Sequence, residues 1–203
     1  MIKLEKKESI YFLTMDAGEN RWNTTFVREI AKALDTIEDD EGPGALITSA
    51  TDSKFFSNGL DLDWMQAPED YPDGGDREVF GEEFMYLMGR FITLPIPTIC
   101  ALNGHTFGAG FMFALSHDFR IMREDRGFLC ANEMQLGLPI PRPELALFKH
   151  KIPANAFFET VQLSKRWTGT DALEAGIVQE VSSFEELSNE ALIKAKELSP
   201  LAN

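Results

Sequence analysis

The chain has 203 residues, 44% of them hydrophobic and 26% charged, and is long enough to bury a sizeable core as one domain, residues 1–203. Its formal net charge of −14 argues against nucleic acid or an anionic membrane surface as a partner, because both attract basic patches. No apolar run reaches the length of a bilayer span, and residues 1–7 lack the apolar core of a signal peptide, so we expect a cytoplasmic protein. Cys100 and Cys130 have apolar neighbours and no metal-ligand spacing, which predicts buried free thiols.

Patterns in the first part of the chain predict a parallel crossover unit. Residues 4–15 alternate as in a strand or a hairpin of two short strands. Asn23 is placed to cap a helix with apolar residues at helical spacing, and the breakers at residues 39–44 end it. A buried strand at residues 45–49 completes a strand, helix, strand unit, which is typical of a parallel sheet. Residues 54–65 then predict an aromatic-rich turn that leads into a short helix.

The rest of the chain continues this alternation of helices and strands. Residues 66–76 are rich in Pro, Gly and acidic side chains and predict a mobile loop. The apolar run at residues 92–102, the glycines that follow it and the apolar pattern up to residue 115 predict a strand, a tight turn and a helix. Further strands are expected at residues 118–122 and 127–133, helices at 78–91, 143–150, 154–163 and 183–198, and a short helix, a glycine stop and a last strand within 168–178.

The turn at residues 102–110 is the part of the sequence that most suggests chemistry. Gly104, Gly108 and Gly110 allow close approach of the backbone, and the first turn of the next helix has N–H groups without internal partners. Such N–H groups can hold an oxygen that carries negative charge. A glycine turn that only packs the helix on the sheet is an equal alternative. The spacing is neither G-x-G-x-x-G nor a Gly-Lys-Ser/Thr loop, which disfavours a nucleotide-phosphate site.

Four segments in order resemble the enoyl-CoA hydratase/isomerase, or crotonase, superfamily, and together they span nearly the whole chain. They are Phe-Ser-Asn-Gly-Leu-Asp-Leu (56–62), Ala-Leu-Asn-Gly-His-Thr-Phe-Gly-Ala-Gly (101–110) with Leu-Ser-His-Asp after it, Asn-Glu-Met-Gln-Leu-Gly-Leu (132–138), and the segment 167–178. The resemblance implies an α/β crotonase-like spiral of repeated ββα units with C-terminal helices. It also implies a homotrimer or hexamer and an acyl-CoA thioester as substrate, with coenzyme A as part of the substrate and no other cofactor or metal.

By this resemblance, the backbone N–H groups of Leu60 and Ala109 form an oxyanion hole that polarises the thioester carbonyl. The matching positions also imply a set of substrate-binding residues: Lys54, Ser57, Asn58, Gly59, Asp61, Gly108, Gly110 and Met112. Lys54 is the expected contact of a CoA phosphate, and Arg21 and Trp22 approach the CoA by the same analogy.

The departure from the hydratase pattern points to one reaction. Hydratases of this family use two glutamates, but the first position here is Met112 and only the second is kept, as Glu133. A thioether cannot exchange protons, whereas one carboxylate is enough for a 1,3-proton shift. The sequence is similar to the peroxisomal and plant delta-3, delta-2-enoyl-CoA isomerases, which move the double bond of a 3-enoyl-CoA to give the trans-2-enoyl-CoA. Apolar neighbours such as Met112, Met134 and Leu136 are expected to raise the pKa of Glu133 and strengthen it as a base.

Two other readings stay open. The same fold supports other reactions through an acyl-CoA enolate, such as hydration, and a non-catalytic acyl-CoA-binding protein is a further alternative. The chain ends at residue 203, before the additional helices of many family members, so we expect a neighbouring subunit to complete the cap or the site to be less closed.

Several conspicuous residues have simpler alternatives. His105 is more often a packed or surface residue than a base, and His117 and His150 have still less support. Asp61 is more naturally a helix cap than a metal ligand, and Lys54 is equally well a solvated lysine. A helical apolar stripe is more often part of the core than the lining of an acyl pocket, and this applies to Phe80, Phe84, Leu87 and Met88. Glu144 stands where the family often has a glycine-rich turn, which leaves the shape of the acyl pocket open.

Overall fold

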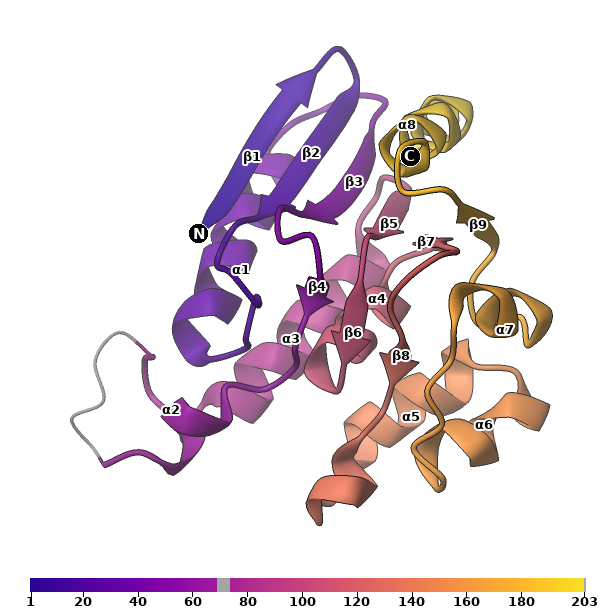
Figure 1. Ribbon diagram of the computed structural model, residues 1–203. Coiled ribbons are helices and arrows are strands. Elements are labelled where there is room, and N and C mark those ends of the chain that lie inside the picture. The colour runs from indigo at the N-terminus through magenta and orange to yellow at the C-terminus, as the bar shows by residue number, and fades with distance from the viewer. Residues whose placement is uncertain (69–73, 203) are drawn as a thin grey trace.

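The computed structural model describes residues 1–68 and 74–202, and helices pack around two β-sheets (Figure 1). Within the described residues, the large sheet has six strands in the order β1-β2-β3-β5-β7-β9, and the small sheet has three in the order β4-β6-β8. The strands are β1 (Ile2–Lys7), β2 (Ile10–Met15), β3 (Ala45–Ala50), β4 (Phe55–Ser57), β5 (Thr98–Leu102), β6 (His105–Phe107), β7 (Phe119–Arg123), β8 (Leu129–Cys130) and β9 (Glu180–Ser182). The α-helices are α1 (Thr24–Glu38), α2 (Leu62–Gln66), α3 (Phe80–Thr93), α4 (Ala109–Ser116), α5 (Arg142–Lys151), α6 (Ala154–Val161), α7 (Gly169–Glu174) and α8 (Leu187–Leu198), and the 3₁₀ helices are η1 (Glu133–Leu136) and η2 (Ser199–Leu201).

The N-terminal part forms the predicted hairpin and crossover. β1 and β2 pair antiparallel, and β3 then lies parallel to β2. Between them, the side chain of Asn23 accepts a hydrogen bond from the Phe26 N–H at 2.9 Å and caps helix α1. This cap satisfies one of the N–H groups that the first helical turn leaves free.

Three ββα units follow, as the family resemblance implied. In each, a strand of the large sheet leads into a short strand of the small sheet and then into a helix. The units are β3, β4 and the helices α2 and α3; then β5, β6 and α4; then β7, β8 and, after η1, α5. The small-sheet strands pair parallel, β4 with β6 and β6 with β8, so their carboxyl ends lie at one edge.

Alternating side chains give the large sheet two buried faces. Leu46, Cys100 and Met122 point into the main core with α1, α3 and α4, whereas Ile47 and Ile121 point to the opposite face. Helix α8 covers that second face with Leu187, Ala191 and Ala195, and it stands apart from the other helices in Figure 1. A parallel strand covered on both faces is apolar throughout, which explains why the β3 and β5 segments are so hydrophobic.

The structure corrects several predicted boundaries. Residues 55–57 form a strand where the sequence predicts only a turn, and Ile92 and Thr93 belong to helix α3 rather than to a strand. The strand after them starts at Thr98, because Pro95 and Pro97 have no N–H for a ladder. The turn predicted after residue 102 contains a further strand, β6.

Two later predictions are also wrong in detail. The strand expected at residues 127–133 is limited to Leu129–Cys130, and Glu133 opens the 3₁₀ helix η1. The last strand begins at Glu180, after Val178 rather than within the 168–178 segment. The predicted loop at residues 66–76 includes residues 69–73, which lie outside the described residues. Over residues 1–68 and 74–202, we find no helix that is both long and apolar enough to cross a membrane.

Candidate active site

The cavity with the greatest number of predicted site residues lies at the carboxyl edge of the small sheet. It has a volume of about 540 Å³ and is bounded by the β4–α2 loop, α3, the start of α4, η1 and the start of α5. Residues from the three ββα units meet there because each follows the end of a small-sheet strand: Leu60 after β4, Ala109 after β6 and Glu133 after β8. Parallel strands bring their carboxyl ends to one edge, and open α/β sheets bind ligands at such edges.

The cavity contains most of the predicted site residues, but not all of them. Its lining includes Asn58, Gly59, Leu60, Gly108, Ala109, Met112 and Glu133. Lys54, Ser57, Asp61 and Gly110 are not part of this lining. The residues that line the cavity therefore remain candidate substrate-binding residues, whereas the other four lie behind or beside it.

A β-bridge next to the cavity leaves the N–H of Leu60 without a hydrogen-bond partner. Trp22 and Leu60 form an isolated parallel bridge, in which the Trp22 N–H donates to the Gly59 carbonyl at 2.8 Å and the Asp61 N–H donates to the Trp22 carbonyl at 2.9 Å. In such a bridge the backbone N–H and C=O of the central residue, Leu60, point away from the segment that contains Trp22. Among the described residues, no acceptor binds the Leu60 N–H.

The N–H of Ala109 is free because it opens helix α4. It is the first residue of the helix, and the described part of the chain offers it no hydrogen-bond acceptor. Gly108, just before it, is held by its own N–H, which donates to the Cys130 carbonyl of β8 at 3.0 Å. Two residues with unpaired backbone N–H groups thus line one cavity, and an oxyanion hole requires such donors.

Glycines at these turns are required by conformation and space. Gly59 has a φ of +83°, and a Cβ there would lie 2.9 Å from the Phe107 carbonyl oxygen. Gly108 has a φ of +47°, and its Cβ would lie 3.0 Å from Oε1 of Glu133. Side chains other than hydrogen strain the backbone at positive φ, and here they also intrude between the site groups.

Ser57 and Gly110 support the site from behind. Ser57 is fully buried; its hydroxyl donates to the Asn20 carbonyl at 2.7 Å and accepts from Nε1 of Trp22 at 3.0 Å and from the Gly59 N–H at 3.3 Å. A Cβ on Gly110 would lie 2.5 Å from Cβ of Ser57, so α4 touches β4 at this point. Both residues therefore position the β4–α2 loop, residues 58–61, and in this structure neither lines the cavity.

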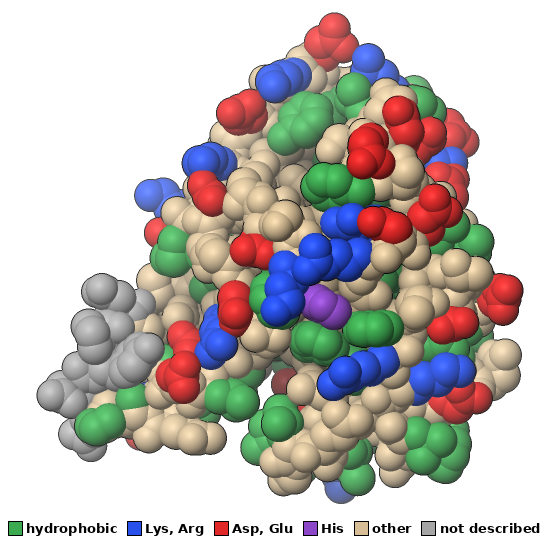
Figure 2. All heavy atoms as spheres, in the orientation of Figure 1, with side chains coloured by type: hydrophobic (Ala, Val, Ile, Leu, Met, Phe, Trp, Pro, Cys, Tyr) green, Lys and Arg blue, Asp and Glu red, His purple; other side chains and the backbone are tan. Residues whose placement is uncertain are grey.

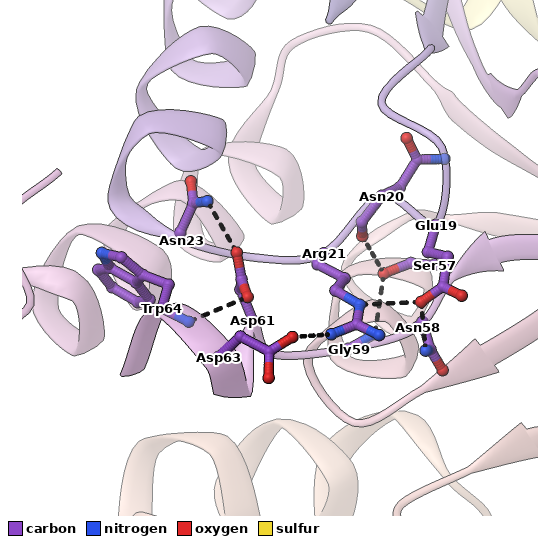
Figure 3. A network of polar contacts seen from close by, with 10 residues as sticks. All are labelled: Glu19, Asn20, Arg21, Asn23, Ser57, Asn58, Gly59, Asp61, Asp63 and Trp64. Atoms are coloured by element: carbon purple, nitrogen blue, oxygen red, sulfur yellow. Dashed lines mark hydrogen bonds and ion pairs between the residues drawn. The ribbon is translucent and has the colours of Figure 1, made fainter. Parts of the chain in front are cut away.

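Figure 3 shows the polar network that holds this loop in place. Asp61 caps α2 by accepting from the Trp64 N–H at 3.2 Å, and it accepts from the Asn23 side chain at 3.3 Å. Glu19 accepts from Nδ2 of Asn58 at 2.8 Å and from Nε of Arg21 at 2.8 Å. Asp61 is thus a structural cap, in line with the simpler of the two sequence readings.

Glu133 is the buried carboxylate of the cavity. Its side chain is 9% exposed, and its Oε2 has no hydrogen-bond partner among the described residues. Burial raises the pKa of this carboxyl above its usual range. The pKa direction confirms the expectation, although only part of the expected apolar surroundings is present: Met112 is buried in the cavity wall, whereas Met134 is 53% exposed.

Glu144 is a second carboxyl in the same cavity, and the sequence reading did not assign it a role there. It lies in the first turn of α5 and is half-buried. Burial, and after it the negative charge of Glu133, raises the pKa of Glu144 to about 7. Its place after Pro143 in a new helix was readable in the sequence, but its nearness to Glu133 depends on how α5 packs.

Other singled-out residues divide between core and surface. Trp22 is fully buried and packs edge-on against Phe26, Phe84 and Phe113, so it does not reach a surface site. The α3 stripe is split: Phe80 and Phe84 line the cavity, whereas Leu87 and Met88 lie in the core. Arg21 and Arg77 add positive charge to the cavity wall, and no sequence pattern singled out Arg77.

His105 and Lys54 lie outside the cavity lining; His105 begins strand β6 of the small sheet, and Lys54 comes directly before strand β4. The His105 ring stacks on Phe107 at 5.4 Å between ring centroids. Burial and the positive charges of Lys54, Arg126 and Arg166 lower the pKa of His105. A neutral, stacked imidazole matches the packed residue that the sequence favoured. We call Lys54, Arg126 and Arg166 the cationic patch.

Comparison with known proteins agrees with this geometry. Residues 5–202 match the model of the enoyl-CoA hydratase/isomerase family. The chain is 36% identical over 181 residues to enoyl-CoA delta isomerase 2, peroxisomal, of Arabidopsis thaliana, which covers 88% of this chain and 75% of that protein. It is 32% identical over 200 residues to enoyl-CoA delta isomerase 1, peroxisomal, of the same plant. This match covers 97% of this chain and 81% of that protein.

The fold agrees as well. The crystal structure of an enoyl-CoA hydratase from Mycobacterium ulcerans superposes with a TM-score of 0.88 at 25% identity, and the match covers 98% of this chain and 85% of that one. The two-sheet architecture, its three ββα units and the family match over residues 5–202 agree with one another. This chain therefore belongs to the enoyl-CoA hydratase/isomerase family and has the crotonase fold.

Proposed function

We propose that this chain is an enoyl-CoA isomerase that converts a 3-enoyl-CoA to the trans-2-enoyl-CoA. The observation that carries the proposal is one buried carboxylate with a free oxygen, Glu133, in the same cavity as the unpaired N–H groups of Leu60 and Ala109. Relatives that are 36% and 32% identical bear the name enoyl-CoA delta isomerase, which favours this member of the family's reactions.

The proposed chemistry follows from these groups. Glu133 takes a proton from C2 of the thioester, and the electron pair moves toward the carbonyl oxygen. The N–H groups of Leu60 and Ala109 stabilise the resulting enolate, by about 3 kcal/mol for each donor where water is excluded. A raised pKa makes the Glu133 carboxylate a stronger base than an exposed one.

Met112 argues against water addition by the usual pair of glutamates. Its thioether lies in the cavity wall and is buried, so it can neither position a water nor carry a proton. Glu144 favours a second candidate, hydration of a 2-enoyl-CoA, because it restores a second carboxyl from a different element. Hydration by this pair is the alternative function that the same assay distinguishes.

Surface charge supports an anionic ligand of the CoA type. Figure 2 shows Lys and Arg side chains gathered around a histidine on one face, beside a hollow. The members of the cationic patch, Lys54, Arg126 and Arg166, make no ion pair with any described residue. On a chain with a net charge of −14, unpaired cations at one place favour the phosphates of CoA.

The test is conversion of a 3-enoyl-CoA by purified protein, followed as formation of the conjugated 2-enoyl thioester. Glu133→Gln keeps the size of the side chain but removes the base, so kcat should fall by about 10²–10⁴-fold. Glu190→Gln, in the first turn of α8 and away from the cavity, is the matched control and should keep wild-type activity. Wild-type protein that binds CoA thioesters but forms no conjugated product contradicts the proposal. Formation of a 3-hydroxyacyl-CoA from a 2-enoyl-CoA supports hydration instead.

A further inference from the structure

Glu144 and Glu133 approach the cavity from two different walls. Glu133 opens η1 just after strand β8, whereas Glu144 comes from the first turn of α5. The segment that joins them in the chain lines the cavity with apolar residues and prolines: Leu136, Leu138, Pro139 and Pro141. Two carboxyls in one largely apolar cavity do not both ionise easily, because each negative charge disfavours the other.

No described residue neutralises Glu144. Its carboxyl has no hydrogen bond or ion pair within residues 1–68 and 74–202, although it is half-buried. Of the positive groups that line the cavity, Arg21 is paired with Glu19 and Asp63, and Arg77 donates to the Pro68 carbonyl. Helix α4, which packs against α5, has no charged side chain, and Glu159 of α6 pairs with Lys165.

These surroundings divide the two carboxyls into a base and an acid. The pKa of Glu144, about 7, leaves a large share of its carboxyl protonated at neutral pH, while the charge of Glu133 is itself a cause of that shift. Oε1 of Glu133 lies near Gly108, where a Cβ would be 3.0 Å away, so only the missing side chain of this glycine leaves room for the carboxylate. Because the two carboxyls reach the cavity from η1 and from α5, one can stand near C2 of a bound substrate while the other stands near C4.

We propose that Glu144 is the second catalytic residue of the isomerisation and donates the proton that C4 receives. This inference rests on the proposed isomerase function. In the first step, Glu133 forms an O–H bond as the C2–H bond breaks, and the electron pair enters a dienolate held by the Leu60 and Ala109 N–H groups. In the second step, the C4–H bond forms with the proton of Glu144, the double bond moves to C2–C3, and Glu144 becomes a carboxylate. Proton transfer from Glu133 to Glu144, direct or through water, restores the starting state.

Isotope transfer separates this mechanism from a shuttle by Glu133 alone. The substrate is a 3-enoyl-CoA with deuterium at C2, converted in ordinary water with enzyme in excess so that each molecule turns over once. When Glu144 is the donor, wild-type protein leaves no deuterium at C4 of the product. Glu144→Gln should lower kcat by about 10²-fold, and its residual turnover should carry deuterium from C2 to C4 through Glu133.

Two further variants make the test robust. Glu144→Asp keeps a carboxyl on a shorter side chain and should recover part of the rate without label at C4, even where Glu144→Gln is inactive. Glu190→Gln should behave as wild type in rate and in label. Transfer of deuterium to C4 by wild-type protein, or a kcat of Glu144→Gln within about twofold of wild type, overturns the role of Glu144 while leaving the isomerase intact. If wild-type protein forms no conjugated product, the isomerase function fails, and the proton-donor role fails with it.

Discussion

Gly108 lies next to two groups of the candidate site, the Ala109 N–H and the Glu133 carboxylate. It lies between strand β6 and helix α4, so its conformation aims the Ala109 N–H, and a Cβ at this position would lie 3.0 Å from Oε1 of Glu133. Its φ of +47° is a conformation that residues with a side chain rarely adopt. A side chain at this position would therefore disturb both the proposed oxyanion donor, Ala109, and the proposed base, Glu133.

We expect Gly108→Ala to lose activity more than stability. The added Cβ stands 3.0 Å from Oε1 of Glu133, and small displacements of reacting groups cost about 10²-fold in rate. Gly137→Ala is the matched control, because Gly137 also has positive φ, +69°, but nothing lies within 4 Å of its Cβ. Gly137→Ala should lose about 1–2 kcal/mol of stability, because Gly137 has the left-handed conformation. Gly108→Ala should lose more, because its ψ of −118° lies outside that region and disfavours a side chain further. Equal kcat values for the two variants contradict this account of Gly108.

At the scale of elements, the contact between α4 and β4 sets the distance between the two proposed oxyanion donors, Leu60 and Ala109. Gly110 lets the first turn of α4 rest on Ser57, whose hydroxyl also accepts from the Gly59 N–H. Leu60 follows directly, so the packing of a helix on a strand sets the position of both free N–H groups. Glycine is needed here for space, whereas in an open helix it only costs stability.

Two glycines in helices should therefore respond in opposite directions. Gly89 of α3 is exposed with nothing within 4 Å, and Gly89→Ala should raise the free energy of unfolding by about 0.5–1 kcal/mol. Gly110→Ala forces a Cβ to 2.5 Å from Cβ of Ser57, so it should lower the free energy of unfolding by about 1–3 kcal/mol and also reduce activity. Chemical denaturation of both variants measures the difference. A stable, active Gly110→Ala protein contradicts the proposed spacing role.

At the scale of the whole molecule, a buried histidine joins the second and first ββα units. His117 is fully buried next to α4; its Nδ1–H donates to the Phe113 carbonyl at 2.9 Å, and its Nε2 accepts from the Thr48 hydroxyl of β3 at 2.8 Å. Burial lowers the pKa of His117 to about 3, so the ring is neutral in the folded protein. This residue packs the fold and has no access to the cavity.

The pH dependence of stability should report this histidine. Below its ordinary pKa of 6.5 the unfolded chain binds a proton that the folded protein does not, so stability falls with pH from 6.5 toward 3. The loss amounts to about 2 kcal/mol between pH 7 and pH 5. Denaturation of His117→Gln at both pH values should show a correspondingly smaller loss, whereas His150→Gln, exposed on α5, should match wild type. A His117→Gln protein with the wild-type pH dependence contradicts the assignment.

The sequence by itself determined the long elements and the turns between them. Helical spacing and the Asn23 cap predicted α1, apolar runs predicted the buried strands β3 and β5, and breakers marked most of the boundaries. The glycines at 104, 108 and 110 indicated the turn at which backbone N–H groups become available, and the family resemblance added Gly59. Local preferences and side-chain periodicity suffice for these features because their cause lies within a few residues of chain.

Tertiary structure alone decided the small sheet and the partners in the cavity. Strands of two or three residues, such as β4, β6 and β8, are too short to show a period and exist because residues some 50 or 25 positions apart pair. Tertiary contacts also explain why Ser57, which the resemblance placed among the substrate-binding residues, does not line the cavity. Its hydroxyl makes hydrogen bonds with Trp22 and Asn20 instead. Glu144 entered the site because α5 folds back over Glu133, and the ionisation of a carboxyl depends on charges and burial that the neighbouring elements provide.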